Sequence, residues 1–175
     1  MAEIIGGIFT SHVPAIGNAI SRGQQSDPYW KPFFDGLAPV RSWLHEKAPD
    51  VAIVFFNDHG LSFFLDRMPT FAVGVAAEYQ SADEGWGLPS YPSAAGTPLL
   101  SWHIVESLVA DEFDITICQE MLLDHAVTIP SELCWPGEAA IRPRIVPIVI
   151  NTVQHPLPSP KRGLPLGRAV GGAPG

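Results

Sequence analysis

The stretch Asp50-Val-Ala-Ile-Val-Phe-Phe56 is followed at once by Asn57-Asp58-His59. An almost unbroken apolar run of this length predicts a strand covered on both faces, as in the parallel sheets of α/β proteins. The polar triplet places His59 just beyond the carboxyl end of that strand. Because the carboxyl ends of parallel strands line the ligand crevice of such sheets, the stretch predicts both a fold class and the position of a site.

Strand and helix patterns alternate along the rest of the chain. Strands are predicted over 3–9, 70–76, 113–118 and 144–150 from β-branched and apolar runs. Helices are predicted over 27–44, with a bend at Gly36 and Pro39, and over 97–111, because apolar residues recur there every three or four positions. A long loop is predicted over 81–98. This alternation predicts an α/β fold with a mainly parallel central sheet and helices on both faces.

The composition changes sharply after Gln154, where proline and glycine become frequent. Residues 163–175 are rich in Gly, Ala and Pro, and the local preferences of these residues predict a tail without regular structure. Residues 1–162 are then the folded part, and the sheet is expected to be incomplete at the C-terminus. A truncated protein, or a shifted reading frame near this end, is the expectation.

Composition excludes several classes of protein. With 175 residues, 46% hydrophobic and 16% charged, the chain is expected to fold as one domain. A net charge of −8, with no basic run longer than Lys161-Arg162, argues against a nucleic-acid partner. The apolar runs are of strand length and no secretion signal is visible, so we expect no membrane span, a cytoplasmic location, and reduced thiols at Cys118 and Cys134.

Histidines His12, His59 and His125 each stand between an apolar segment and a loop, after Ser11, Asp58 and Asp124. If strand ends bring the rings together, they suit Fe(II), Zn, Cu or Ni, and two histidines with one carboxylate leave open positions on iron. Each residue also has a structural interpretation. His12 would cap the following helix, Asp58 would hold His59, and Asp124 would hold His125. Their dispersed spacing does not separate the two interpretations.

An ordered set of short motifs is more specific. It comprises Ser11-His12-Val-Pro-Ala-Ile-Gly17, Asn57-Asp58-His59, Ser81-Ala-Asp-Glu-Gly-Trp-Gly87, Trp102-His103-Ile104, Leu123-Asp124-His125, Arg144-Ile-Val-Pro147 and His155-Pro156. In these motifs, over residues 3 to about 162, the chain resembles the catalytic β subunit of class III extradiol dioxygenases of the protocatechuate 4,5-dioxygenase type. Residues 1–162 would then be the N-terminal part of that catalytic domain.

The resemblance implies a site. His12 and His59 would be ligands of a ferrous ion, His125 a catalytic and substrate-contacting residue, and Asp58 a substrate-binding residue. The loop from Asp83 to Gly87 would be a wall of the pocket. The implied activity is the O2-dependent extradiol (meta) cleavage of a catecholic acid such as protocatechuate, in a protein that assembles with a small α subunit or with copies of itself.

The resemblance also implies what is missing. The family's glutamate ligand and a further acid/base histidine lie downstream of the matched residues, so activity is expected to be impaired in this chain. Two alternatives stay open. One is a catalytically inactive remnant that binds metal or a partner protein, and the other is a zinc-binding relative with a different reaction, because histidine ligands do not select iron over zinc.

Overall fold

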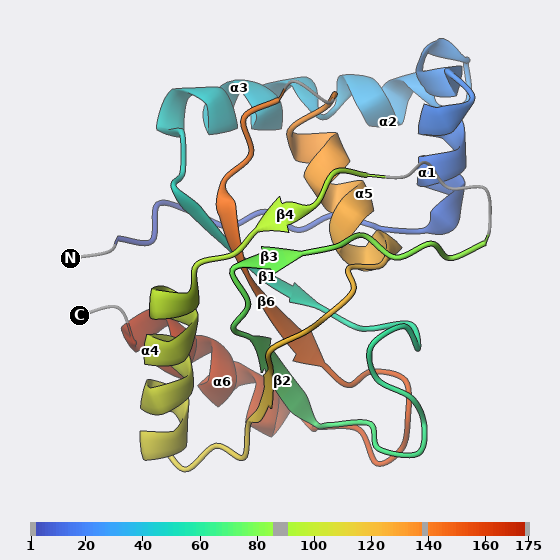
Figure 1. Ribbon diagram of the computed structural model, residues 1–175. Coiled ribbons are helices and arrows are strands. Elements are labelled where there is room, and N and C mark those ends of the chain that lie inside the picture. Colours follow the sequence, from blue (N-terminus) through green and yellow to red (C-terminus); the bar gives the residue numbers. More distant parts are fainter. Residues whose placement is uncertain (1–2, 86–90, 138–139, 174–175) are drawn as a thin grey trace.

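The computed structural model describes residues 3–85, 91–137 and 140–173 (Figure 1). The helices are α1 (Pro14–Ser21), the short 3-10 helix η1 (Gln24–Ser26), α2 (Lys31–Asp35), α3 (Ala38–Lys47), α4 (Pro98–Ala110), α5 (His125–Cys134) and α6 (Pro160–Gly172). The strands are β1 (Val51–Phe56), β2 (Phe71–Gly74), β3 (Glu78–Tyr79), β4 (Ala94–Ala95), β5 (Thr116–Cys118) and β6 (Arg144–Ile150).

The central sheet has the strand order β1-β6-β2-β5. β1 runs parallel to β6 and β2 runs parallel to β5, while β2 and β6 are antiparallel. β3 and β4 form a separate small antiparallel sheet. The predicted α/β class with a mainly parallel central sheet is confirmed, and so are the predicted strands at 70–76 and 144–150 within a few residues.

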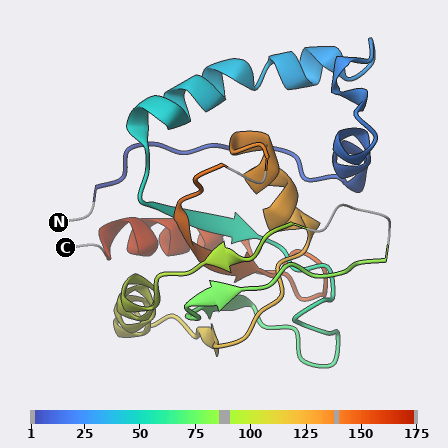
Figure 2. The same ribbon diagram turned by 45° about the horizontal axis from the view of Figure 1, so that its top comes forward.

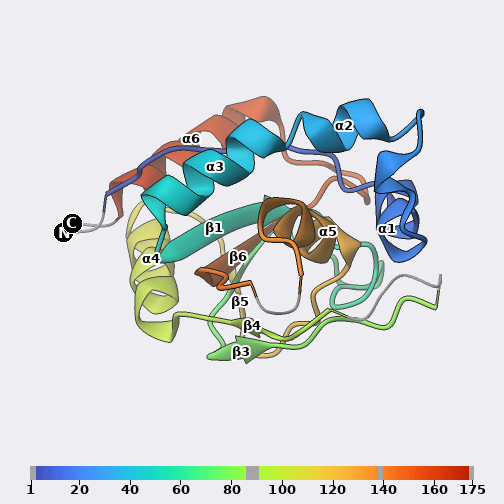
Figure 3. The ribbon, with the colours of Figure 1, turned by 90° about the horizontal axis from the view of Figure 1, so that it is seen from above.

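Side chains alternate between the two faces of this sheet. Phe71 and Val73 of β2 pack with α4 and α6, whereas Ala72 between them packs with the start of α5 and with Tyr79. This is the period of two that a strand imposes on its side chains. Helices therefore cover both faces, as the sequence predicted (Figure 3).

An outer layer of helices covers α5 (Figure 2). Ile16 and Ala19 of α1 and Phe34 of α2 pack against Ile129 and Leu133 of α5. The helix predicted over 27–44 is present as α2 and α3, with the chain interrupted between them near the predicted bend. Because α1 packs on α5, the loop before α1 lies near the start of α5, where the candidate site is found.

The strand predicted over residues 3–9 is wrong. The structure gives this segment no strand, and it leaves Phe9 98% and Ile4 62% exposed. Apolar, β-branched composition favours a strand, but a strand also needs a neighbouring edge with which to exchange backbone hydrogen bonds. The described strands pair among themselves, and none pairs with this segment.

The irregular tail predicted over 163–175 is also wrong for the residues that are described. Helix α6 runs through this region from Pro160, with Pro165 inside it. Leu166 and Val170, four residues apart, are 0% and 3% exposed and belong to the core that α4 shares with the sheet. Burial of one apolar stripe outweighs the poor helix propensity of Gly and Pro, because most helix stability in proteins comes from such packing.

Gly96 is a point where the core admits no side chain. A Cβ atom there would lie 2.1 Å from the Ala76 carbonyl oxygen and 2.8 Å from the Tyr79 ring. We expect Gly96→Ala to lower the free energy of unfolding by about 1–3 kcal/mol, measured by urea denaturation. Gly163→Ala in α6 is the matched control: a Cβ there meets nothing within 4 Å, so this variant should be neutral or slightly more stable. Equal urea midpoints for the two variants would contradict the assigned packing.

No helix in the described ranges is long and apolar enough to cross a membrane.

Candidate metal centre

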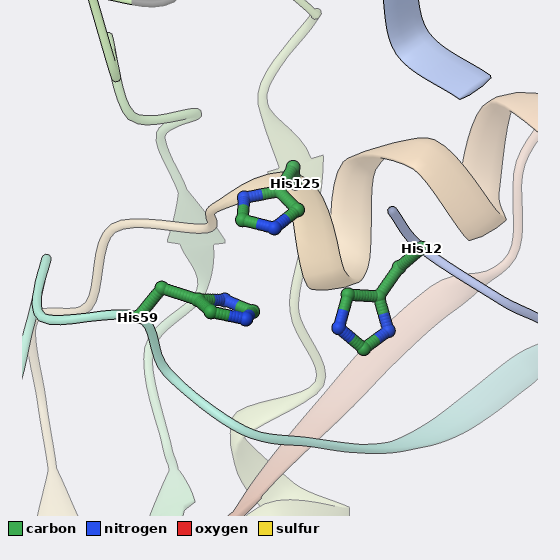
Figure 4. A group of neighbouring side chains, drawn as sticks. All are labelled: His12, His59 and His125. Carbon is green, nitrogen blue, oxygen red and sulfur yellow. The ribbon is translucent and has the colours of Figure 1, made fainter. Parts of the chain in front are cut away.

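Three histidines from distant parts of the chain meet at one place (Figure 4). His12 lies in the loop before α1, His59 lies beyond the end of β1, and His125 is the first residue of α5. The ring centroids are 5.4 Å apart for His12 and His59, 5.7 Å for His12 and His125, and 4.2 Å for His59 and His125. One nitrogen from each ring lies within 4.8 Å of those of the other two. The predicted convergence of the three imidazoles is thus present in the structure.

A buried carboxylate holds His59. The Oδ2 atom of Asp124 accepts hydrogen bonds from both the backbone N–H and the ring Nδ1–H of His59, each at 2.8 Å. The Asp124 side chain is fully buried, while that of His59 is 31% exposed. A carboxylate at Nδ1 keeps the proton on that nitrogen, so Nε2 carries the lone pair that a metal needs.

The pairing of carboxylates with histidines differs from the structural interpretation of the sequence. Asp58 does not hold His59, and Asp124 holds His59 rather than its neighbour His125. The Asp58 carboxylate turns back into its own loop, where it accepts backbone N–H groups from residues 60–63. Consecutive side chains leave the backbone in different directions, so an adjacent Asp and His do not face each other here.

The sequence also named Asp58 as a substrate-binding residue. Its side chain is 2% exposed and both of its oxygens accept backbone hydrogen bonds. The structure therefore gives Asp58 a place in shaping the loop that follows His59. A direct contact with substrate stays a prediction.

His125 has a carboxylate partner that the sequence did not single out as one. Glu84 accepts the backbone N–H of His125 at 2.7 Å and contacts its ring Nδ1 at 2.6 Å. Both side chains are buried, at 3% exposed for His125 and 5% for Glu84. Glu84 belongs to the loop that the sequence predicted as a pocket wall; Trp86 and Gly87 of that loop lie outside the described residues.

Helix α5 was also missed by the sequence prediction. Its N-cap is Asp124, whose Oδ1 atom accepts the backbone N–H of Ala126 at 2.9 Å. The available signal was Asp124 directly before His125-Ala126-Val127, since Asp is a favoured N-cap residue. Pro130 within the helix obscured that signal.

His12 sits in a setting that favours its neutral form. Partial burial, followed by the proximity of His59 and of His125, lowers the pKa of His12 below its usual value of 6.5, and Asp124 opposes this weakly. Neutral imidazole is the form that ligates metals. At neutral pH this side chain therefore needs to lose no proton before it binds a cation.

The donor set fits a first-row divalent metal. Imidazole nitrogens suit Fe(II) and Zn, and a carboxylate behind a ligating histidine is the usual arrangement at such sites. Asn57 Nδ2 lies 3.1 Å from His59 Nε2, so its amide can donate to the lone pair that would bind the metal. This amide would have to move aside for a cation to bind His59.

Three histidines that meet beyond the end of β1, with a buried carboxylate behind His59, are the features of a site for one metal ion. The family model described as "Catalytic LigB subunit of aromatic ring-opening dioxygenase" matches residues 6–174. The chain therefore belongs to the LigB family, the class III extradiol dioxygenases.

Curated relatives bear the same kind of name. A 2,3-dihydroxyphenylpropionate/2,3-dihydroxicinnamic acid 1,2-dioxygenase of Photorhabdus laumondii is 32% identical over 165 residues, which are 94% of this chain and 49% of the relative. The enzyme of this name from Rhodococcus globerulus is 33% identical over 136 residues, 75% of this chain and 40% of the relative. The chain spans about half the length of the relatives it matches, or less.

Proposed function

We propose that this chain takes part in the Fe(II)-dependent extradiol cleavage of a catecholic acid by O2. The observation that carries the proposal is the meeting of His12, His59 and His125, with the ring of His59 anchored at Nδ1 by Asp124. Family membership supports the same activity.

In this proposal His12 and His59 hold the ferrous ion. When bound, the ion would supply open positions for the two catechol oxygens and for O2, and the redox path between them. The protein orients the ring of His59 through Asp124, and the loop shaped by Asp58 keeps His59 at the end of β1. His125, beside both proposed ligands, lies where a substrate hydroxyl can exchange a proton with its ring.

The substrate class is proposed as catechols that carry a carboxylate. Protocatechuate is the substrate that the sequence motifs suggest, whereas the relatives above are named for 2,3-dihydroxyphenylpropionate. Both molecules combine a catechol with a carboxylate group. Assembly with a small α subunit or with further copies of this chain, and a cytoplasmic location, are likewise proposals.

The test is an anaerobic Fe(II) titration of the chain, followed by calorimetry or by a competing chelator. We expect His12→Ala and His59→Ala each to weaken Fe(II) binding by about tenfold or more, because each removes one of few ligands. His45→Ala, in the exposed last turn of α3, is the control and should bind as the unmodified chain does. Unchanged affinity in both site variants would remove the ligand assignment.

One observation favours zinc as a second candidate ion. The described cluster offers nitrogen ligands from histidine alone, a donor set that zinc accepts in catalytic sites. A parallel titration with Zn(II) under the same conditions compares the two ions. Binding of Zn(II) with no measurable Fe(II) binding would favour a zinc-dependent relative over a dioxygenase.

A further inference from the structure

Two buried carboxylates each contact both the backbone N–H and the ring Nδ1 atom of one histidine. Asp124 accepts both the backbone N–H and the Nδ1–H of His59. Glu84 contacts the backbone N–H and the Nδ1 atom of His125 in the corresponding arrangement. The Asp124–His59 pair is explained if His59 is a metal ligand. The Glu84–His125 pair has no role in that assignment.

The Glu84 pair is built into the fold rather than formed on the surface. The chain before Glu84 is tied to the segment before α5, since Leu123 N–H donates to Gln80 O at 2.9 Å and Ala82 N–H donates to Leu123 O at 2.8 Å. Glu84 then reaches the first residue of α5, where the backbone N–H has no carbonyl acceptor in a preceding helical turn and the helix dipole favours a negative charge.

The two buried carboxylates share the N-terminus of α5. Glu84 accepts the N–H of His125, and Asp124 accepts the N–H of Ala126. A buried carboxylate is costly unless it is paired and hydrogen-bonded. Glu84 meets that requirement only in the position that also fixes the ring of His125, so the loop, the helix start and the ring orientation depend on one another.

We infer that Glu84 is a positioning residue that keeps the proton of His125 on Nδ1 and directs its unprotonated Nε2 toward the space shared with His12 and His59. Figure 4 shows one ring nitrogen of His125 facing that space, while the other points away from it. A ring in this state presents a hydrogen-bond acceptor, rather than a donor, to that space, and the carboxylate behind it fixes which of the two nitrogens does so.

This inference rests on the proposed function for its consequence: as the diol binds, Nε2 of His125 would accept a hydrogen bond from a catechol hydroxyl. The orientation of the ring is testable without metal or substrate.

The test is long-range ¹H–¹⁵N NMR of the metal-free chain labelled at histidine, with the His125 signals assigned by their loss in His125→Asn. We expect the unmodified chain to show His125 protonated at Nδ1 and unprotonated at Nε2. Glu84→Ala should shift this signature toward a mixture of the two tautomers. Glu84→Gln keeps an oxygen that can accept only one of the two N–H groups, so its signature should lie between those of the other two proteins.

Asp83→Ala is the matched control in the same loop. Among the described residues its carboxylate accepts a hydrogen bond from the N–H of Gly85 alone, so the His125 signals should not change. Circular dichroism checks that each variant is folded. If Glu84→Ala does not fold, the comparison is made with Glu84→Gln instead.

A folded Glu84 variant with an unaltered His125 signature would overturn the inference, as would an Nδ1 without a proton in the unmodified chain. Because no metal takes part, these outcomes are independent of the Fe(II) titration. Failure of the metal assignment would leave the tautomer result standing.

Discussion

Replacing Asp124 with alanine is expected to lower the free energy of unfolding by about 2–4 kcal/mol and to weaken Fe(II) binding by about 10–100-fold. The stability loss has two sources. The variant removes the N-cap of α5, and it leaves the backbone N–H of His59 without its acceptor. The affinity loss follows because the His59 ring is no longer held at Nδ1.

Asp124→Asn separates these two effects. Its amide oxygen can still accept the N–H of Ala126, so the helix cap is largely kept. The amide nitrogen then faces the N–H groups of His59, where donor meets donor. We expect this variant to lose less stability than Asp124→Ala, because only the acceptor for His59 is lost, while Fe(II) binding is still weakened.

Thermal unfolding and anaerobic Fe(II) titration measure the two quantities on the same samples. Asp66→Asn is the control, since this exposed carboxylate pairs with Arg67 and with no other residue in the part of the chain that the structure describes. If both Asp124 variants bind Fe(II) as tightly as the control, the carboxylate does not position His59.

Leu166→Ala is expected to cost about 2–5 kcal/mol of unfolding free energy. Leu166 is completely buried in α6, and its side chain packs in the core cluster of the sheet and α4. Removing it leaves a cavity that this core cannot readily fill, because helix and sheet enclose it.

Leu164→Ala in the same helix is the control. Leu164 is 62% exposed, so its truncation should change stability by no more than about 0.5 kcal/mol. Urea denaturation followed by circular dichroism measures both variants. Equal midpoints would mean that residues 163–172 behave as part of the irregular tail predicted over 163–175, and not as a docked helix.

The spacing of apolar residues correctly predicted those helices and strands whose local sequence pattern fits only one kind of element. The apolar run of β1 and the three- and four-residue spacing of α4 each predict one kind of element, and the structure has both. Residues 3–9 and helix α6 were predicted wrongly because their state depends on neighbours. A strand needs an adjacent edge, and a helix rich in glycine and proline needs a core against which to pack.

The site divides in the same way. His12, His59 and His125 could be named from the chain because each occurs in a recognisable motif beside an apolar segment. Asp124 was considered only as the sequence neighbour of a histidine, and Glu84 only as part of a loop, while Asp58 was named for substrate binding by resemblance. Hydrogen bonds between a side chain and a distant segment cannot be predicted from the spacing of residues along the chain.

The sequence by itself determined the fold class, the histidines and the family, because hydrophobic period and motif order are properties of the chain. Only the tertiary structure decided which carboxylate supports which histidine. Asp124 reaches back 65 positions to His59, and Glu84 reaches forward 41 positions to His125. Such hydrogen bonds depend on where folding places the start of α5, and no local preference of the residues encodes that position.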